Sequence, residues 1–513
     1  MSVDEEAYKK AKEFFVSGHN GTSVGEVALV LSVLSTSLWF YSELMVVVEK
    51  LGLLGKSKLQ RTLSLLVIEF VLLVLPILIS FTFTEFTLPI TRTSTLVFAV
   101  GAIALGTLSW RHAGESDKKL ARKDKLTFLM STEKPAVTCF RAQMMICTCV
   151  AILAVDFTIF PRRFAKTETF GVSLVCHQMD SGVGLFIMSS ALTSAYARGA
   201  VAKRASSSFS LRAIWLFLRP MLPVLVLGVI RYVSVKKVNY QPIKTFSMKF
   251  NQSDRLWIGL VGAIRLHPLP KFEHVTEYGV HWNFYFTLAS LYFTFSLLAL
   301  FGSIATSVPV ALLLLAGYQV GLTSYGIADF IFHAPRVDLF SQNREGIFSL
   351  CGYLPLYLLS VAIGQVIFST SNSTTSRHLV RGDRWVVAKL FMIGMTAWGV
   401  TSLATKHLTP PSRRLINVPY VGWIVWQGVL VLTTHSAYLH LCMSPRVPLI
   451  FTGISRNQLF VFLIANLITG AVNLSMQTLY APPVVGFGIM LLYLFAVSVL
   501  AVGLEWFHIK VKL

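Results

Sequence analysis

Long apolar stretches alternate with short polar ones along almost the whole chain. A helix that crosses a bilayer needs about 20 mainly apolar residues, and about thirteen such runs occur in this sequence. The predicted spans are 24–48, 62–83, 93–110, 136–157, 171–197, 213–234, 281–303, 305–330, 347–370, 385–405, 419–441, 457–480 and 484–507. The pattern therefore predicts an all-α polytopic membrane protein.

Composition agrees with this pattern. Of the 513 residues, 54% are hydrophobic and only 13% are charged, whereas soluble domains average about 25% charged residues. The start of the chain is charged and lacks the apolar core of a signal peptide, so we expect the first span to direct insertion. We expect residues 1–513 to form a single transmembrane domain.

The distribution of Lys and Arg predicts the orientation. Four lie in the first loop, one in the second and seven in the third. Because these residues favour the cytoplasmic side, the N-terminus is predicted to be lumenal and, after thirteen spans, the C-terminus cytoplasmic. The sixth loop is an exception, with eight cations on the lumenal side. The net charge of +21 indicates lipid headgroups or a phosphorylated substrate as partners, and not nucleic acid.

An acid and several cations follow the fourth span. Asp156 stands at its end, and Arg162, Arg163 and Lys166 come just after it. Ionisable groups at membrane spans are costly and often functional, although a plain interfacial ion pair would give the same pattern. A desolvated carboxylate beside an ammonium suits removal of a proton from a hydroxyl. Asp156 and Lys166 are therefore candidate catalytic residues for group transfer to an alcohol, and the arginines are candidate phosphate ligands.

The polar stretches between the spans fall together on the predicted lumenal side of the membrane. They are 160–169, 273–283, 341–349 and 412–420, together with one face of the twelfth span that carries Asn466, Asn473 and Gln477. We interpret this clustering as one site, with capping, interfacial anchoring and interhelical hydrogen bonding as the alternatives. The candidate substrate-binding residues are Arg162, Arg163, His281, Trp282, Asn283, Asn343, Arg344, Arg413, Arg414 and Asn473.

Common catalytic and metal-binding motifs are absent from the sequence. It contains no Walker loop, HExxH, GxSxG or dinucleotide fingerprint, and the six cysteines lack metal-ligand spacing. We therefore predict no metal site and no permanently bound cofactor.

Eight segments resemble one family in order along the chain. They are 14–23, 140–146 (FRAQMMI), 151–171 with its FPRRFAK block, 179–184 (MDSGVG), 273–284, 341–349 (SQNREGIFS), 412–420 (SRRLINVPY) and 465–476. These resemble the glucosaminyl-phosphatidylinositol inositol acyltransferases of GPI-anchor biosynthesis. Residues 175–178 and about 242–272, the latter within the lumenal loop 235–275, depart from the family pattern as inserts.

The resemblance implies a multi-pass protein of the endoplasmic reticulum membrane. Such an enzyme transfers a fatty acyl group, commonly palmitoyl, from acyl-CoA as co-substrate to the inositol 2-hydroxyl of glucosaminyl-phosphatidylinositol. Asp156 and Lys166 match its catalytic aspartate and lysine. Three alternatives remain open. The first is a polytopic lipid transporter, in which these two residues would form a gating or proton-coupling pair. The others are a non-catalytic membrane scaffold and a histidine-dependent membrane-bound O-acyltransferase, in which His281 would be essential.

Overall fold

The computed structural model describes most of the chain. Described are residues 22–82, 86–131, 133–164, 178–199, 219, 221–238, 278–304, 306–369, 376–442 and 444–511, with six positions between 7 and 15. Lys166 and both predicted inserts, except for Gln178, lie outside these ranges.

Every predicted span overlaps a helix. The helices are α2 (Val24–Lys50), α3 with η1 and α4 (Lys58–Thr82), α5 (Thr87–Arg111), α7 (Pro135–Ala154), α8 (Gln178–Leu192), α10 (Met221–Val238), α12 (Phe284–Leu300), α13 (Val308–Ser324), α16 (Arg344–Phe368), α17 (Ser376–His407), α18 (Val418–Leu441), α20 (Gln458–Ser475) and α21 (Pro483–Trp506). Within the described residues there is no strand, and eight helices are long and apolar enough to cross a membrane, or nine with a bent pair. The all-α, multi-pass class is confirmed, and the count of thirteen stays a prediction.

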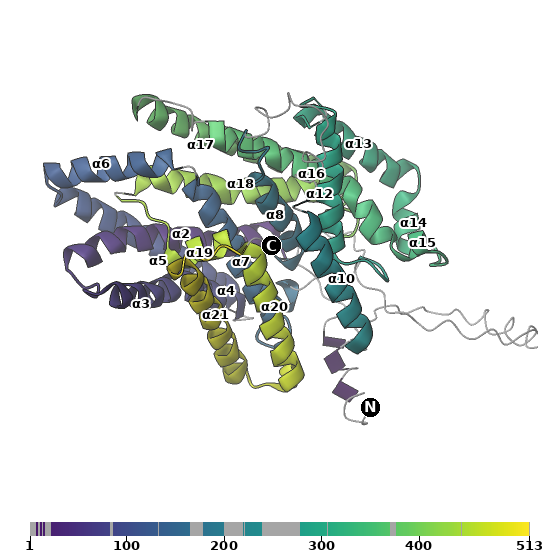
Figure 1. The fold of residues 1–513 in the computed structure, drawn as a ribbon, viewed down its shortest axis with the longest axis horizontal. Helices are drawn as coiled ribbons and strands as arrows, with labels where there is room; N and C mark the ends of the chain where they lie inside the picture. Colours follow the sequence, from purple (N-terminus) through teal and green to yellow (C-terminus); the bar gives the residue numbers. More distant parts are fainter. Residues whose placement is uncertain are drawn as a thin grey trace, which may run out of the picture.

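Further helices of the described residues lie between these. They are α6 (Glu115–Met130), α14 (Ile327–His333), α15 (Leu339–Gln342) and α19 (Leu449–Arg456). Figure 1 shows α2, α17 and α18 running along the long axis, with α20 and α21 together at one side.

The eighth and twelfth predicted spans differ from the helices that the structure shows. The predicted eighth span, 305–330, is broken by a 65° bend between α13 and α14, where Gly326 adopts a left-handed φ of 68° that suits glycine. The twelfth span ends at Ser475, because Met476 is extended with a φ of −153°. Gln477 therefore lies beyond the helix and does not share its face.

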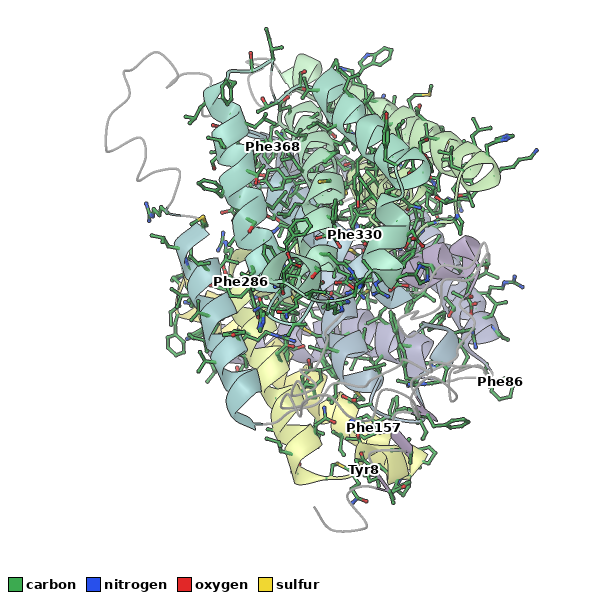
Figure 2. The ribbon with its side chains drawn as sticks, turned by 90° about the vertical axis from the view of Figure 1, so that its right-hand side faces the viewer. Tyr8, Phe86, Phe157, Phe286, Phe330 and Phe368 are labelled. Atoms are coloured by element: carbon green, nitrogen blue, oxygen red, sulfur yellow. The ribbon has the colours of Figure 1, made fainter. Side chains whose placement is uncertain are left out.

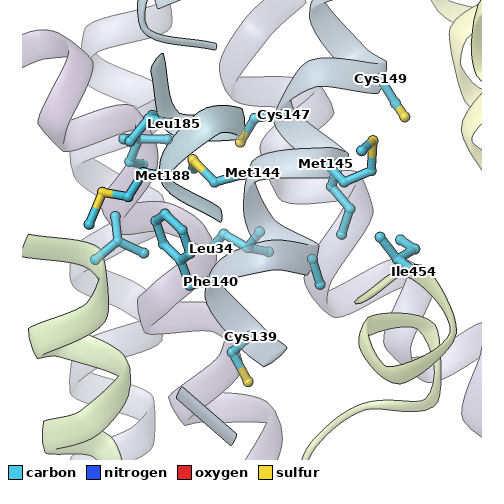
Figure 3. Close-up of a cluster of buried hydrophobic side chains, with 14 of the residues drawn as sticks. Leu34, Cys139, Phe140, Met144, Met145, Cys147, Cys149, Leu185, Met188 and Ile454 are labelled. Atoms are coloured by element: carbon cyan, nitrogen blue, oxygen red, sulfur yellow. The ribbon is translucent and has the colours of Figure 1, made fainter. Parts of the chain in front are cut away.

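Helix α7 is the centre of the bundle. It packs against α4, α8, α18, α19, α20 and α21, and most of its residues are buried. Figure 3 shows its Phe140, Met144 and Met145 side chains among those of the neighbouring helices. Helices in lipid associate through close packing and not through exclusion of water, so the small residues of α7, including Ala142 and Ala151, allow its neighbours to approach.

Helix α19 crosses α21 at a glycine. A Cβ atom on Gly453 would overlap the backbone carbonyl of Ala501, and backbone atoms cannot move aside as a flexible side chain can. We therefore expect Gly453→Ala to lower the free energy of unfolding by about 1–3 kcal/mol through overpacking. Thermal unfolding in detergent measures this. Gly488→Ala on α21, where nothing lies within 4 Å, is the matched control, and an equal loss in both variants would contradict the account.

Candidate active site

Asp156 lies in the turn that follows α7. The helix ends at Ala154, earlier than the predicted 157, and the Asp156 amide donates to the Leu153 carbonyl at 3.1 Å. Its carboxylate accepts a hydrogen bond from Asn473 Nδ2 at 2.8 Å and pairs with Lys12 Nζ at 3.2 Å. The side chain is 17% exposed, so this carboxylate is partly open.

Asn473 is held with its amide group facing the acid. It lies near the end of α20, and its Oδ1 accepts a hydrogen bond from Thr478 Oγ1 at 3.4 Å. With the oxygen engaged in this way, the NH₂ group points to Asp156. The predicted candidate Asn473 therefore does contact the predicted catalytic acid, across 317 positions of sequence.

The N-terminal segment brings an ammonium group that the sequence analysis missed. Lys12 contacts Asp156, Tyr8 packs edge-on against Tyr480 with ring centroids 5.4 Å apart, and Phe15 lies 3.9 Å below the Arg162 guanidinium. The only signal for Lys12 was the charged character of the first residues, which carries no information on a distant partner. Lys166, the predicted ammonium, lies outside the described residues.

Arg162 closes the end of α7. Its guanidinium donates to the carbonyls of Val155 at 2.8 Å and of Phe157 and Phe160 at 3.2 Å, which satisfies groups that a helix end leaves without partners. Burial lowers the pKa of Arg162 to about 10, although the Asp156 charge acts in the opposite direction. Its buried Nη1 has no hydrogen-bond partner in the described part of the chain, so one donor remains for a ligand.

Arg163 has a protein partner. Its Nη2 and Nε lie 2.9 and 3.1 Å from Glu26 Oε1, and the Thr22 hydroxyl also donates to Glu26. This pair ties the first turn of α2 to the turn that carries Asp156. Glu26 was not predicted, because its partner is 137 positions away.

The other candidates form a second group around the start of α12 and α16. The His281 amide donates to Asn343 Oδ1 at 2.9 Å, and its ring nitrogen Nε2 lies 3.2 Å from Gln342 Oε1. Asn343 donates to the Leu339 carbonyl, and no side-chain bond from it caps α16. Asn343 therefore occupies the N-cap position of α16, as the capping alternative predicted, but its side chain does not make the capping hydrogen bond.

Trp282 and Asn283 fix how α12 begins. Trp282 Nε1 donates to Thr287 Oγ1 at 2.8 Å, and the ring fills the space beside Gly346. Asn283 caps α12 by accepting from the amides of Tyr285 and Phe286, and it donates to the Gly228 carbonyl of α10 at 3.0 Å. These contacts place the loop before α12 firmly against α16 and α10.

Three arginines of the second group are bound within the protein. Arg344 Nε donates to the Ile331 carbonyl at 2.9 Å near the end of α14. Glu345, only 2% exposed, pairs with Arg414 at 2.7 Å and also with Arg336. Arg413 pairs with Asp180 at 3.4 Å and reaches the Tyr278 hydroxyl at the same distance. Asp180 and Arg336 are partners that the sequence analysis did not single out.

The described candidates thus lie in two groups. Figure 2 shows Phe157, in the Asp156 turn, and Tyr8 at one end of the molecule, away from Phe286 on α12 and Phe330 on α14. Three of the four predicted polar loops meet in the second group, and residues 160–164 lie with Asp156. The sequence analysis predicted a single site because the polar loops share one predicted side of the membrane. Within the described residues, these loops form two separate groups.

Comparison with known proteins decides the family. The sequence profile of the GWT1 family matches residues 8–245 and 248–504. The chain belongs to the GWT1 family. The break in the match falls within the predicted insert 242–272. The resemblance found in the sequence is therefore confirmed.

Relatives match over nearly the full length. The chain is 35% identical to GPI-anchored wall transfer protein 1 of Gibberella zeae, over 99% of this chain and all of that one. The protein of the same name from Yarrowia lipolytica is 35% identical over 78% of this chain and 77% of its own length. Phosphatidylinositol-glycan biosynthesis class W protein of Dictyostelium discoideum is 29% identical over 99% of both chains.

Glu345 holds the second group together, and its loss is the sharpest test of that role. Glu345→Gln removes the buried carboxylate that Arg336 and Arg414, 20% and 34% exposed, share, and loss of hydrogen bonds to a charged group typically costs about 1.5–3 kcal/mol of stability. We expect a clear drop in the thermal unfolding temperature in detergent. Glu115→Gln, which removes an 85% exposed carboxylate of a 3.9 Å pair, is the control. A Glu345→Gln protein as stable as this control would show that the ion cluster is not structural.

Proposed function

We propose that the chain is an acyl-CoA-dependent O-acyltransferase of GPI-anchor biosynthesis. It moves a fatty acyl group, palmitoyl in the simplest case, to the inositol 2-hydroxyl of glucosaminyl-phosphatidylinositol. The observation that carries the proposal is the Asp156 carboxylate, which is partly exposed and held by an amide and an ammonium. Membership of the GWT1 family and the names of the relatives support it.

The proposal includes the setting of the enzyme. Residues 1–513 form one acyltransferase domain in the endoplasmic reticulum membrane, with about thirteen spans, a lumenal N-terminus and a cytoplasmic C-terminus. Acyl-CoA acts as co-substrate and no cofactor is permanently bound.

The chemistry needs a base and a place for negative charge. Asp156 takes the proton of the inositol hydroxyl as the oxygen attacks the thioester carbonyl. The oxyanion that forms expels the CoA thiolate, the carbon–sulfur bond breaks, and the proton on Asp156 passes to the thiolate. Lys166, by family resemblance, steadies the developing charge, and Asn473 keeps the carboxylate in position. No acyl-enzyme forms in this scheme.

The remaining candidates have positioning roles in this proposal. Arg162 has a spare buried donor for a substrate phosphate, whereas Arg163 donates to Glu26 and Arg344 donates to backbone carbonyls. His281, Trp282, Asn283, Asn343, Arg413 and Arg414 shape the surface that orients the acceptor lipid. The contact of His281 with Gln342 favours such a role over that of an essential base.

Removal of the acid tests the function directly. Purified Asp156→Asn and Lys166→Ala proteins should bind glucosaminyl-phosphatidylinositol and fail to acylate it, because general-base catalysis contributes about 10²–10⁴-fold. The measurement is release of free CoA in step with acylated lipid. Asp117→Asn, at a half-exposed surface pair, is the control, and His281→Ala should still turn over.

Three outcomes would contradict the proposal. Full turnover by Asp156→Asn would remove the acid from its role. Loss in His281→Ala with activity kept in Asp156→Asn would indicate a histidine-dependent acyltransferase. Lipid movement across the bilayer without release of CoA by the wild-type protein would indicate a transporter.

Asn473 offers a finer test of the geometry. Asn473→Leu removes a hydrogen bond to a charged group, worth about 1.5–3 kcal/mol, so we expect turnover to fall about ten- to hundred-fold. Asn466→Leu is the matched control, since Asn466 lies on the same helix and donates to the Phe462 carbonyl of that helix. Equal turnover in the two variants would mean that the amide does not position Asp156.

A further inference from the structure

A basic cavity lies at the opposite end of α7 from Asp156. Its volume is about 180 Å³, and it is bounded by the start of α7, the segment after α8, the end of α16, the end of α19 and the C-terminal segment. In the topology predicted from the sequence, with thirteen spans and a lumenal N-terminus, all five segments lie on the cytoplasmic side. The charged residues that line it are Glu133, Lys134, Arg141, Arg198, Arg456 and Lys510.

The cations in this cavity outnumber the carboxylates that face them. Arg456 lies 3.3 Å from Glu133 and 2.5 Å from Glu505, and Lys510 lies 3.8 Å from the same Glu133. Arg141 donates to the neutral groups Gln458 Oε1 at 3.0 Å and Ser455 Oγ at 3.5 Å. Arg198 lies over the Phe368 ring at 5.8 Å. An anion in the cavity would offset this excess of positive charge.

Lys134 and the N-terminus of α7 add further positive charge to the cavity. Lys134 is only 5% exposed, and burial lowers its pKa, although Asp383 acts in the opposite direction. It occupies the N-cap position of α7 without a side-chain cap, and Val137 and Thr138 of the first turn line the cavity. The positive end of the helix dipole is therefore added to the side-chain charges.

The C-terminal segment is fixed so that Lys510 completes the wall. After α21 the chain reverses through His508, which has a left-handed φ of 54°, and the Ile509 amide donates back to the Leu504 carbonyl at 2.8 Å. This is the hydrogen-bond pattern of a Schellman turn. Asn457 holds the segment by two hydrogen bonds: its side chain donates to the Ile509 carbonyl at 3.2 Å and accepts from the Val511 amide at 2.8 Å.

Size and place identify the class of ligand. The cavity is smaller than the roughly 300–1,000 Å³ of pockets for drug-sized molecules, so it fits a phosphate-bearing head and not a whole nucleotide. Arg141 lines the cavity, and the thirteen residues of α7 beyond it place Asp156 about 20 Å further along the helix, so a ligand held in the cavity alone does not reach that acid. Phe507 and Ile509, 71% and 47% exposed, offer an apolar surface next to Lys510.

We propose that this cavity binds the phosphate monoester headgroup of an anionic phospholipid. Basic pockets between transmembrane helices on the cytoplasmic side are a general means of holding such lipids. The proposal does not depend on the acyltransfer reaction, because the site and its ligand lie away from Asp156.

Ligand-induced stabilisation of the full-length protein in detergent tests it. Dioctanoyl phosphatidic acid should raise the unfolding temperature of the wild type in a saturable way, and dioctanoyl phosphatidylcholine should not. The double variant Arg198→Gln with Lys510→Gln should need at least about tenfold more phosphatidic acid for half the effect, the change expected for a loss of about 1.4 kcal/mol. Arg198→Lys with Lys510→Arg should keep the wild-type response.

A matched variant controls for overall charge. Arg122→Gln with Lys123→Gln makes the same charge change at exposed positions of α6 and should respond as the wild type does. An equal loss in this control, or no response of the wild type, would overturn the proposal. A stronger and equally variant-sensitive response to coenzyme A would assign the cavity to the nucleotide of the donor instead. Should the double variant fail to fold, the wild-type comparison of the three ligands decides.

Discussion

The burial of α7 on nearly every face is the constraint from which the arrangement of the molecule follows. Six helices pack against it, so its two ends are fixed relative to all of them. One end presents Asp156, and the other opens into the basic cavity. A helix in lipid gains nothing from leaving water, and its position is set by how closely its neighbours fit. The small and adaptable residues of α7 therefore determine where both charged regions lie.

The carboxylate in each of the two polar groups is neutralised in a different way. Glu345 is nearly inaccessible and carries arginine partners on its carboxylate, which is how a buried acid avoids the penalty of desolvation. Among the described residues, Asp156 contacts the Lys12 ammonium and the Asn473 amide, and it keeps part of its surface open. An acid surrounded by arginines has no open side for a substrate hydroxyl, whereas a partly exposed one has. The contrast supports the acid at the end of α7, and not that at the start of α16, as the reactive one.

The sequence predicted a large part of this picture. Each apolar run overlaps a helix, because length and hydrophobicity are local properties, and eight or nine of the described helices are long and apolar enough to cross a membrane. They missed the bend at Gly326 and the end of α20 before Gln477, which depend on single backbone conformations. The family motifs pointed to Asp156 and Asn473, and the structure brings the two together. Lys12, Glu26 and Arg336 were missed because their partners are identified only by three-dimensional contact. Arg344 was selected as a ligand, and its described hydrogen bonds are to backbone carbonyls.

The link between Asp156 and Asn473 has a consequence for biogenesis. The two residues are 317 positions apart, and Tyr8 meets Leu479 across 471. The ribosome must therefore deliver α20 to the membrane before the acid acquires its amide partner, and until then Lys12, made earlier, is the partner that the carboxylate has in the chain. Contacts of such long range form late and slowly. A nascent chain halted ahead of α20 would be an incomplete helical bundle for quality control to recognise, however well its earlier helices had inserted.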